Sequence, residues 1–420
     1  MRILYVSQYF PPEMGAPAAR VHELSRYWAE SSHDVTVLTG FPNHPTGVVP
    51  PEYRSRFRRG VCRERVDGID VVRTWLFPSP NRKGYERLLN YLSFCLSACV
   101  TGAFVRRPDV IIATSPQLFV GVTGWWLGKI KRACFFLEIR DLWPESITAA
   151  GMSDDKAIGI RMLRALAGFL YRASDRIAVV TPAFKTDIVA RWRIRPDKIL
   201  VAENGVDIDL FTPDVDGEAE KRALGLGGKH IVSFIGTLGL AQGLDVLLDA
   251  SVRVQEGCPD VVFVLIGEGA DKERLATLAQ QRKLRNVSFW PQQPRARVPA
   301  LIRASDICLV LLKKRDVFRT VIPTKMLEFM ACGRPVILGV DGQARRLIEE
   351  AGAGVFIDPE DSEALAQAVI RLQGDPELRR TLGENGRHYI VNRLSRKRMA
   401  EEYIALLEKG VADWRNRRRG

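Results

Sequence analysis

The chain has 420 residues, of which 46% are hydrophobic and 26% charged, and its formal net charge is +13. This length exceeds what one hydrophobic core usually supports, so we expect two domains, and the composition excludes a disordered or fibrous chain. The seven cysteines form an odd set without a CxxC pair, which argues against disulfides or a zinc cluster and indicates reduced thiols in the cytoplasm.

Short β-branched runs alternate with helical patterns twice along the chain, which is typical of two doubly wound parallel-sheet domains. The strands expected in the first half are residues 3–6, 35–38, 69–73, 110–113, 134–139 and 177–180. Those expected in the second half are residues 230–235, 261–266, 287–290, 307–311 and 336–338. We therefore expect a first domain over residues 1–205, a second over residues 206–395, and a last helix, residues 396–420, that returns to the first domain.

Glycines follow several of the expected strands, where ligands bind in parallel sheets. Gly15 follows the first strand, and its backbone could approach an anion in front of a helix N-terminus. It could equally serve only the conformation of the loop. The Gly-Glu-Gly at residues 267–269 is similar to a truncated dinucleotide loop, but a tight turn explains it better.

Positive charge is dense in the first half, notably among the arginines at residues 54–65. Residues 88–105 then form an uncharged run at the lower limit for a membrane-spanning helix. Small polar residues near one face make a surface-bound or core helix more plausible than a spanning one. We expect an anionic membrane surface as a partner, and no nucleic acid, because no DNA- or RNA-binding module accompanies the charge.

Residues 320–337 carry the most informative pattern. Pro323 suits the first turn of a short helix. The N-terminus of this helix offers free N–H groups, the Thr324 hydroxyl and the Lys325 ammonium, a combination suited to a diphosphate. Glu328 lies one turn further on the same face, where its carboxylate could accept from two ribose hydroxyls. The alternative is an i, i+3 pair with Lys325 on an exposed face.

This segment resembles the nucleotide-sugar signature of family 4 retaining glycosyltransferases, and the similarity runs along nearly the whole chain. The residues that carry it are Phe10-Pro-Pro, Gly15, His33-Asp-Val-Thr-Val-Leu-Thr, Asp141-Leu-Trp-Pro-Glu145, Asn204-Gly-Val-Asp207 with Phe211, Gly236, Gln242-Gly243 and Glu328 to Pro335. The chain is most similar to the WbuB-like group of O-antigen, capsule and colanic-acid enzymes. The resemblance implies a GT-B fold, in which two Rossmann-like domains face an interdomain cleft. It also implies a UDP- or GDP-type sugar donor as co-substrate, no cofactor, no catalytic metal, and retention of anomeric configuration.

The function that this resemblance implies is transfer of a sugar to a saccharide acceptor in surface polysaccharide biosynthesis. We expect the acceptor to be lipid-linked and the protein to lie on the inner face of the plasma membrane. One alternative is a nucleotide-sugar epimerase of the same fold, which the basic, apolar first domain disfavours. Another is a non-catalytic nucleotide-sugar-binding subunit of a polysaccharide assembly complex.

The chain departs from the family pattern at its charged positions. The family has two glutamates eight residues apart; Glu328 matches the second, but Thr320 stands at the first, which leaves sugar-hydroxyl recognition unassigned. Thr237 and Gln242 stand where many members carry a basic pair that holds the diphosphate. We expect Lys325, with Arg319 as a second candidate, to replace that charge.

Where many relatives carry a histidine after a strand of the first domain, this chain has Arg140 and Asp141. Asp141 and Glu145 could orient the acceptor hydroxyl, or they could cap the helix that follows. The catalytic candidates are therefore Arg140, Asp141 and Glu145. The donor-binding candidates are Gly15, Gly236, Gln242, Thr320, Thr324, Lys325 and Glu328, and we expect no metal site.

Overall fold

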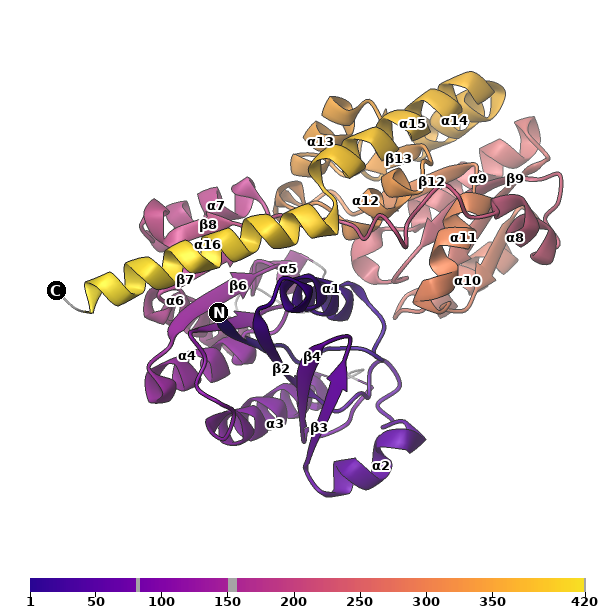
Figure 1. Cartoon of the computed structure of the whole chain (residues 1–420). Helices are drawn as coiled ribbons and strands as arrows, with labels where there is room; N and C mark the ends of the chain where they lie inside the picture. Colours follow the sequence, from indigo (N-terminus) through magenta and orange to yellow (C-terminus); the bar gives the residue numbers. More distant parts are fainter. Residues whose placement is uncertain (81–83, 150–156, 419–420) are drawn as a thin grey trace. The chain divides into compact units, whose positions relative to one another are not determined.

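The computed structural model describes residues 1–80, 84–149 and 157–418, and the chain divides into two compact units (Figure 1). Unit 1 comprises residues 1–145, 153–204 and 396–420, and unit 2 comprises residues 146–152 and 205–395. Each unit is built on a wholly or mainly parallel sheet with helices on both faces. The two doubly wound domains expected from the sequence are confirmed.

The sheet of unit 1 has eight strands in the described part of the chain, in the order β3-β4-β2-β1-β5-β6-β7-β8. These are β1 (Arg2–Val6), β2 (Asp34–Gly40), β3 (Val61–Val66), β4 (Ile69–Thr74), β5 (Val110–Thr114), β6 (Cys134–Ile139), β7 (Arg176–Val179) and β8 (Ile199–Val201). The helices are α1 (Ala16–Glu30), α2 (Pro51–Arg58), α3 (Gly84–Ala103), α4 (Phe119–Lys131), α6 (Ile158–Ala173), α7 (Pro182–Trp192), the 3-10 turn η1 (Pro196–Lys198) and α16 (Arg396–Arg417). In the short helix α5 (Glu145–Ala149), the first residue belongs to unit 1 and the others to unit 2. Among the described strands of this sheet, β3 alone runs antiparallel, against β4.

The core of unit 1 forms around β1, which is flanked by β2 and β5. Tyr5 lies opposite Val37 on one side and Ile112 on the other, and all three are buried. Strands buried on both faces read as continuous apolar runs, which is why they were predictable. The chain's seven cysteines are all free, and none is exposed.

Helix α16 packs on unit 1 through α1 and the sheet. The Trp28 indole N–H donates to the Ala400 carbonyl at 2.9 Å, and its ring meets Tyr403 edge-on at 5.6 Å. Gly410 lies so close to Phe136 of β6 that a Cβ there would be 2.4 Å from the ring. The last helix expected over residues 396–420 corresponds to α16, and a short break at Leu394 separates it from α15, which ends at Arg393.

The sheet of unit 2 is wholly parallel over the described residues, in the order β11-β10-β9-β12-β13-β14. Its strands are β9 (His230–Ile235), β10 (Val261–Ile266), β11 (Val287–Trp290), β12 (Ile307–Leu311), β13 (Val336–Gly339) and β14 (Gly354–Phe356). Its helices are α8 (Gly217–Ala223), α9 (Asp245–Gly257), α10 (Lys272–Gln281), α11 (Val298–Ala304), α12 (Thr324–Ala331), α13 (Gln343–Ala351), α14 (Ser362–Gly374) and α15 (Pro376–Arg393), with 3-10 turns η2 (Leu240–Gln242), η3 (Arg295–Arg297) and η4 (Asp316–Thr320). Strand order reverses between β9 and β12, and ligands bind outside the carboxyl ends of strands at such switch points.

Helix α3 holds most of the uncharged run 88–105, and its polar side chains contact the segment after β4. The Asn90 amide donates to the Phe77 carbonyl at 2.7 Å, and the Ser93 hydroxyl accepts from the Phe77 N–H at 2.8 Å. The small polar residues of this run therefore satisfy backbone groups of the neighbouring segment.

The opposite face of α3 is apolar and exposed. Its exposed residues, with the one that follows the helix, are Leu88, Leu89, Leu92, Leu96, Val100 and Phe104. Leu96 is 69% exposed and Val100 63%, whereas Phe94 and Ala98 are buried on the inner face. Among the helices of the described residues, α3 included, none is both long and apolar enough to cross a bilayer.

Candidate functional site

Two glycines form the carboxyl edge of unit 2 at the switch point. Gly236 follows β9 with φ 141°, and Gly267 follows β10 with φ 152°, both in the region that favours glycine. A Cβ on Gly267 would lie 1.9 Å from the Gly236 carbonyl oxygen, and one on Gly269 2.1 Å from the Leu238 oxygen. The Gly-Glu-Gly segment thus serves a close approach of two loops, which agrees with the tight-turn interpretation.

Helix α12 begins at this edge and directs its N-terminus toward it. Pro323 precedes the first turn, and no side chain caps that turn. The Lys325 side chain reaches back to β9, where its ammonium lies 3.7 Å from the Phe234 ring centroid. A Cβ on Gly236 would be only 2.7 Å from Lys325 Nζ, so this glycine leaves room for the ammonium. Gly236 and Lys325 therefore lie together, and Thr324 is the first residue of the same helix.

Burial lowers the pKa of Lys325 to about 7, although the nearby Glu328 carboxylate acts in the opposite direction. Desolvation favours the neutral amine, so the charged ammonium is unfavourable in this site when no anion is bound. An anion bound beside Lys325 would raise this pKa again. The Lys325 amine and the free N–H groups of α12 thus lie at the same end of this helix.

Glu328 is largely buried, with its side chain 13% exposed, and accepts from Arg295 at 3.1 Å. The Arg295 guanidinium lies 5.0 Å from the Phe211 ring centroid, which fixes its orientation. The exposed Lys325–Glu328 pair considered as an alternative is not what the structure shows, because Lys325 lies on Phe234 instead. Sequence reasoning missed Arg295; the signal was a basic residue shortly after β11.

The other donor-side candidates lie around this centre with different partners. Gln242 ends η2, and its Oε1 is 3.0 Å from the place a Gly239 Cβ would occupy. The Thr320 hydroxyl donates to the Val317 carbonyl at 2.6 Å, within its own turn. Arg319 pairs with Asp341 at 3.2 Å and is 60% exposed, so Lys325 is better placed to replace the missing basic pair.

A second cation that the sequence did not single out lies at the same edge. Lys313 follows β12, and its backbone N–H donates to the Ala241 carbonyl at 2.9 Å. Its Cγ lies 3.0 Å from the place a Gly243 Cβ would occupy. Lys313 therefore lies against the loop that follows β9.

In unit 1, Arg140 lies at the carboxyl end of β6, beside the N-terminus of α1. Its Nη2 donates to the Ala16 carbonyl at 3.3 Å, and its backbone N–H donates to Ser115 at 2.7 Å. Nε and Nη1 of Arg140 are buried and find no hydrogen-bond partner among the described residues. Gly15, with φ 137°, precedes α1 at the same place, so Gly15 and Arg140 come together.

A buried ionic network lies close to Arg140 within unit 1. Arg20 donates to Glu138 at 2.9 Å, and the Tyr5 hydroxyl donates to the same carboxylate at 2.7 Å. Burial alone would raise the pKa of Glu138, but Arg20 and Arg140 hold it below its usual value. Sequence reasoning missed this network, although a charged residue inside the apolar run of β6 was a signal for it.

The two acidic catalytic candidates differ in their surroundings. Burial raises the pKa of Asp141 to about 6 against the opposing effect of Arg140. The Asp141 carboxylate accepts no hydrogen bond from the described residues, so the structure gives no support to a cap role for it. Glu145 is the first residue of α5 and pairs with Arg164 at 3.6 Å and Arg191 at 3.8 Å. The charged neighbour of Asp141 is therefore Arg140, whereas Glu145 forms ion pairs with arginines of α6 and α7.

Glu13 is a further carboxylate that the sequence did not suggest. Its Oε1 accepts from the Asn43 and His44 N–H groups, each at 3.0 Å. Burial raises the pKa of Glu13 to about 7 in spite of these bonds. The group lies in the loop after β1, at the same edge of the sheet as Arg140.

Comparison with known proteins agrees with this geometry. Residues 15–205 match the "Glycosyl transferase 4-like domain" family model, and residues 216–389 match "Glycosyl transferases group 1". The chain belongs to the family 4 glycosyltransferases and has their GT-B fold.

Individual relatives match most of the chain, and solved structures of the same fold match nearly all of it. The putative colanic acid biosynthesis glycosyl transferase WcaI of Escherichia coli K12 is 26% identical over 88% of this chain and 91% of its own. The probable glycosyltransferase WbjE of Pseudomonas aeruginosa is 25% identical over 70% of this chain and 74% of its own. Both are consistent with the WbuB-like group. Sucrose-phosphate synthase from Thermosynechococcus elongatus has a TM-score of 0.77 at 21% identity over 98% of this chain and 99% of its own. Anabaena HepE with UDP and glucose has a TM-score of 0.71 at 18% identity over 97% and 99% of the two chains.

Proposed function

We propose that unit 2 binds a UDP- or GDP-sugar at its carboxyl edge and that the enzyme transfers the sugar to a saccharide acceptor. The observation that carries this proposal is the placement of the Lys325 ammonium against Gly236, beside the uncapped N-terminus of α12. Free N–H groups and a cation are what a diphosphate requires. The structure of HepE with UDP-glucose, a protein of the same fold, supports the choice of donor.

In this proposal Glu328 accepts from the ribose hydroxyls, and Arg295 holds the carboxylate in position. Lys325 and α12 stabilise the negative charge that develops on the departing diphosphate. The donor's own phosphate oxygen takes the proton of the acceptor hydroxyl, and attack occurs on the face from which the nucleotide leaves, so configuration is retained. The positive charge that balances the negative phosphates comes from the protein. We therefore expect activity to need no metal ion.

We further propose that unit 1 receives the acceptor. The buried, unpartnered Nε and Nη1 of Arg140 can donate to an anionic group of a substrate. Asp141, next in the chain, can accept from the acceptor hydroxyl and orient it. Arg140→Gln should therefore lower kcat/KM for the acceptor and leave nucleotide affinity unchanged. If Arg140→Gln weakened nucleotide binding as much as it lowered kcat/KM for the acceptor, this division of roles between the two units would be contradicted.

The exposed apolar face of α3 supports a lipid-linked acceptor at the inner face of the plasma membrane. Leu96 and Val100 can enter the interfacial region of a bilayer, while the arginines of α2 attract anionic headgroups. Phe57 of α2 stacks on Trp75 at 6.2 Å, and the Trp75 carbonyl accepts from Ser97 of α3. Trp75 thus contacts both the basic helix α2 and the apolar helix α3. A surface polysaccharide is the product class that the similarity to WcaI suggests.

A panel of UDP- and GDP-sugars in a thermal-shift measurement tests the donor assignment. We expect one of them to raise the melting temperature of the wild-type protein and to have little effect on Glu328→Gln. A ligand at about 100 times its dissociation constant stabilises the folded state by roughly 2.7 kcal/mol, which such a measurement resolves. If no member of either series shifts the wild type, the donor proposal is wrong. The epimerase and binding-subunit alternatives gain no support from the relatives, which are described as glycosyltransferases.

A further inference from the structure

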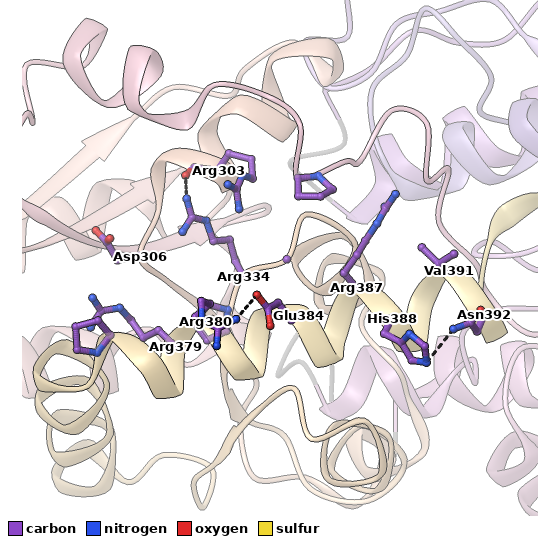
Figure 2. Close-up of a pocket in the computed structure, with 14 residues that line it drawn as sticks. Arg303, Asp306, Arg334, Arg379, Arg380, Glu384, Arg387, His388, Val391 and Asn392 are labelled. Atoms are coloured by element: carbon purple, nitrogen blue, oxygen red, sulfur yellow. Dashed lines mark hydrogen bonds and ion pairs between the residues drawn. The ribbon is translucent and has the colours of Figure 1, made fainter.

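A basic cavity of about 790 Å³ lies at the amino edge of the unit 2 sheet, away from the donor-binding edge (Figure 2). Arg303, at the end of α11, comes just before β12, and Arg334 comes just before β13. Helix α15 contributes Arg379, Arg380 and Arg387. Because α12 runs from the carboxyl edge to the amino edge, this cavity and the Lys325 site lie at opposite ends of that helix.

The acidic residues of this cavity are already paired. Asp306 pairs with Lys221 at 3.1 Å, and Glu384 pairs with Arg380 at 2.6 Å. Figure 2 shows the second of these pairs on α15. The remaining four arginines have no carboxylate within ion-pair distance in the described part of the chain. The cavity therefore carries a surplus of positive charge.

Those four arginines donate to backbone carbonyls. Arg303 donates to Cys332 at 3.2 Å, and Arg334 donates to the Arg303 carbonyl. Arg387 donates to the Ala331 carbonyl at 3.0 Å. Such bonds cap the C-terminal ends of α11 and α12 and hold each guanidinium in place, but they leave its charge uncompensated.

The fourth arginine, Arg379, donates to the Gln373 carbonyl at 2.7 Å and to the Leu372 carbonyl, both near the end of α14. Helix α15 is also fixed against the turn before β13, since a Cβ on Gly383 would lie 2.3 Å from the Gly333 oxygen. The arginines of α15 are therefore held beside the cavity by close backbone packing.

Two donors in the cavity wall are left unsatisfied. The Nε atoms of Arg303 and Arg334 are buried and have no hydrogen-bond partner among the described residues. Burial, and then the charge of Arg303, lowers the pKa of Arg334. Native structures rarely leave buried donors without an acceptor, and capping of two helices does not need a cluster of five arginines around an open cavity.

We propose that this cavity binds a small molecule that carries one or more phosphate groups. A guanidinium presents paired donors that match phosphate oxygens, and several together favour a multiply charged anion. The volume is in the range of small-molecule sites and exceeds what a single phosphate ion fills. The inference does not depend on the donor site, since no residue is shared between them.

Titration calorimetry with inorganic pyrophosphate on the full chain tests the proposal. The double variant Arg379→Gln/Arg380→Gln removes two charges from the side of the cavity, and Arg371→Gln on the exposed face of α14 is the matched control. We expect the double variant to lose at least about tenfold in affinity and the control to lose none. Because pyrophosphate could also enter the donor site, Lys325→Met is titrated in parallel; binding that survives in Lys325→Met and is lost in the double variant belongs to the cavity.

Glu384→Gln provides a test that misfolding cannot mimic. It removes one negative charge from the cavity wall, while Arg380 keeps its pairing with Glu377, so pyrophosphate should bind several-fold more tightly. Equal affinity of the wild type and the double variant would overturn the proposal. It would also be overturned if the wild type bound phosphatidylglycerol vesicles through these arginines and ignored pyrophosphate, because the site would then recognise a lipid surface.

Discussion

Replacement of Lys325 by methionine removes the cation on which the donor site depends while keeping a long, flexible side chain over Phe234. Each charge-assisted bond to a diphosphate contributes about 1.5 to 3 kcal/mol, so loss of one such bond should weaken nucleoside diphosphate affinity roughly 10- to 150-fold. The fold should not suffer, because the ammonium is desolvated and its pKa is lowered to about 7. We expect the melting temperature of the variant to equal or exceed that of the wild type.

The lowered pKa also predicts how affinity depends on pH. In the free protein Lys325 is protonated below about pH 7 and neutral above it, whereas a bound diphosphate requires the ammonium. Binding above that pH must therefore take up a proton, so affinity should fall by up to about tenfold per pH unit until the pKa of the complex is reached. Lys325→Met should show no such dependence.

Calorimetric titration of UDP and GDP between about pH 7.5 and pH 8.5 measures both effects, because the terminal phosphate, with a pKa near 6, is already ionised in that range and the bases are still neutral. Lys409→Met, at an exposed position of α16, is the matched control and should behave as the wild type. If Lys325→Met binds the nucleotide as tightly as the wild type at every pH, Lys325 does not contact the diphosphate and the assignment of the site is refuted.

The remaining predictions concern the ribose, the metal and the membrane. Glu328→Gln should weaken donor binding by about 1.5 to 3 kcal/mol with an unchanged melting temperature, and unchanged nucleotide affinity would refute its role. Transfer activity should survive EDTA; loss on chelation that a divalent ion restores would contradict the mechanism. Leu96→Ser/Val100→Ser should reduce co-sedimentation with anionic vesicles and activity on a lipid-linked acceptor while donor binding stays normal, with Ile370→Ser on unit 2 as control. Wild-type protein that fails to co-sediment at low salt would rule out the membrane role of α3.

The parallel strands β8 and β14 were missed, because each has only three residues and most of these are partly exposed. The other parallel strands were predictable because burial on both faces leaves an unbroken apolar signature. Strand β3 was not, since its Arg63 and Arg65 face outward at the sheet edge and look like a charged loop. The run 88–105 could not be settled from sequence, because its polar positions are explained only by the neighbouring segment that contains Phe77.

The donor-side candidates Thr324, Lys325 and Glu328 were visible because they lie on one turn of one helix. Arg295, which holds Glu328, comes from another loop, and only the fold brings the two together. The basic cavity could not be predicted either, because its arginines come from three separate segments. Nor could the sequence show which face of α3 is exposed. Local chemistry could be predicted, whereas contacts between distant segments could not.

The central claim, that this chain transfers a sugar from a nucleotide to a membrane-associated saccharide, is tested most directly by turnover. Purified protein is incubated with UDP- and GDP-sugars labelled in the sugar, with and without a lipid-linked saccharide, and the label is followed into the lipid extract. We predict transfer by the wild type only when the acceptor is present, and none by Glu328→Gln or Lys325→Met. Conversion of the free donor without acceptor, or donor binding without any turnover across the panel, would contradict the account.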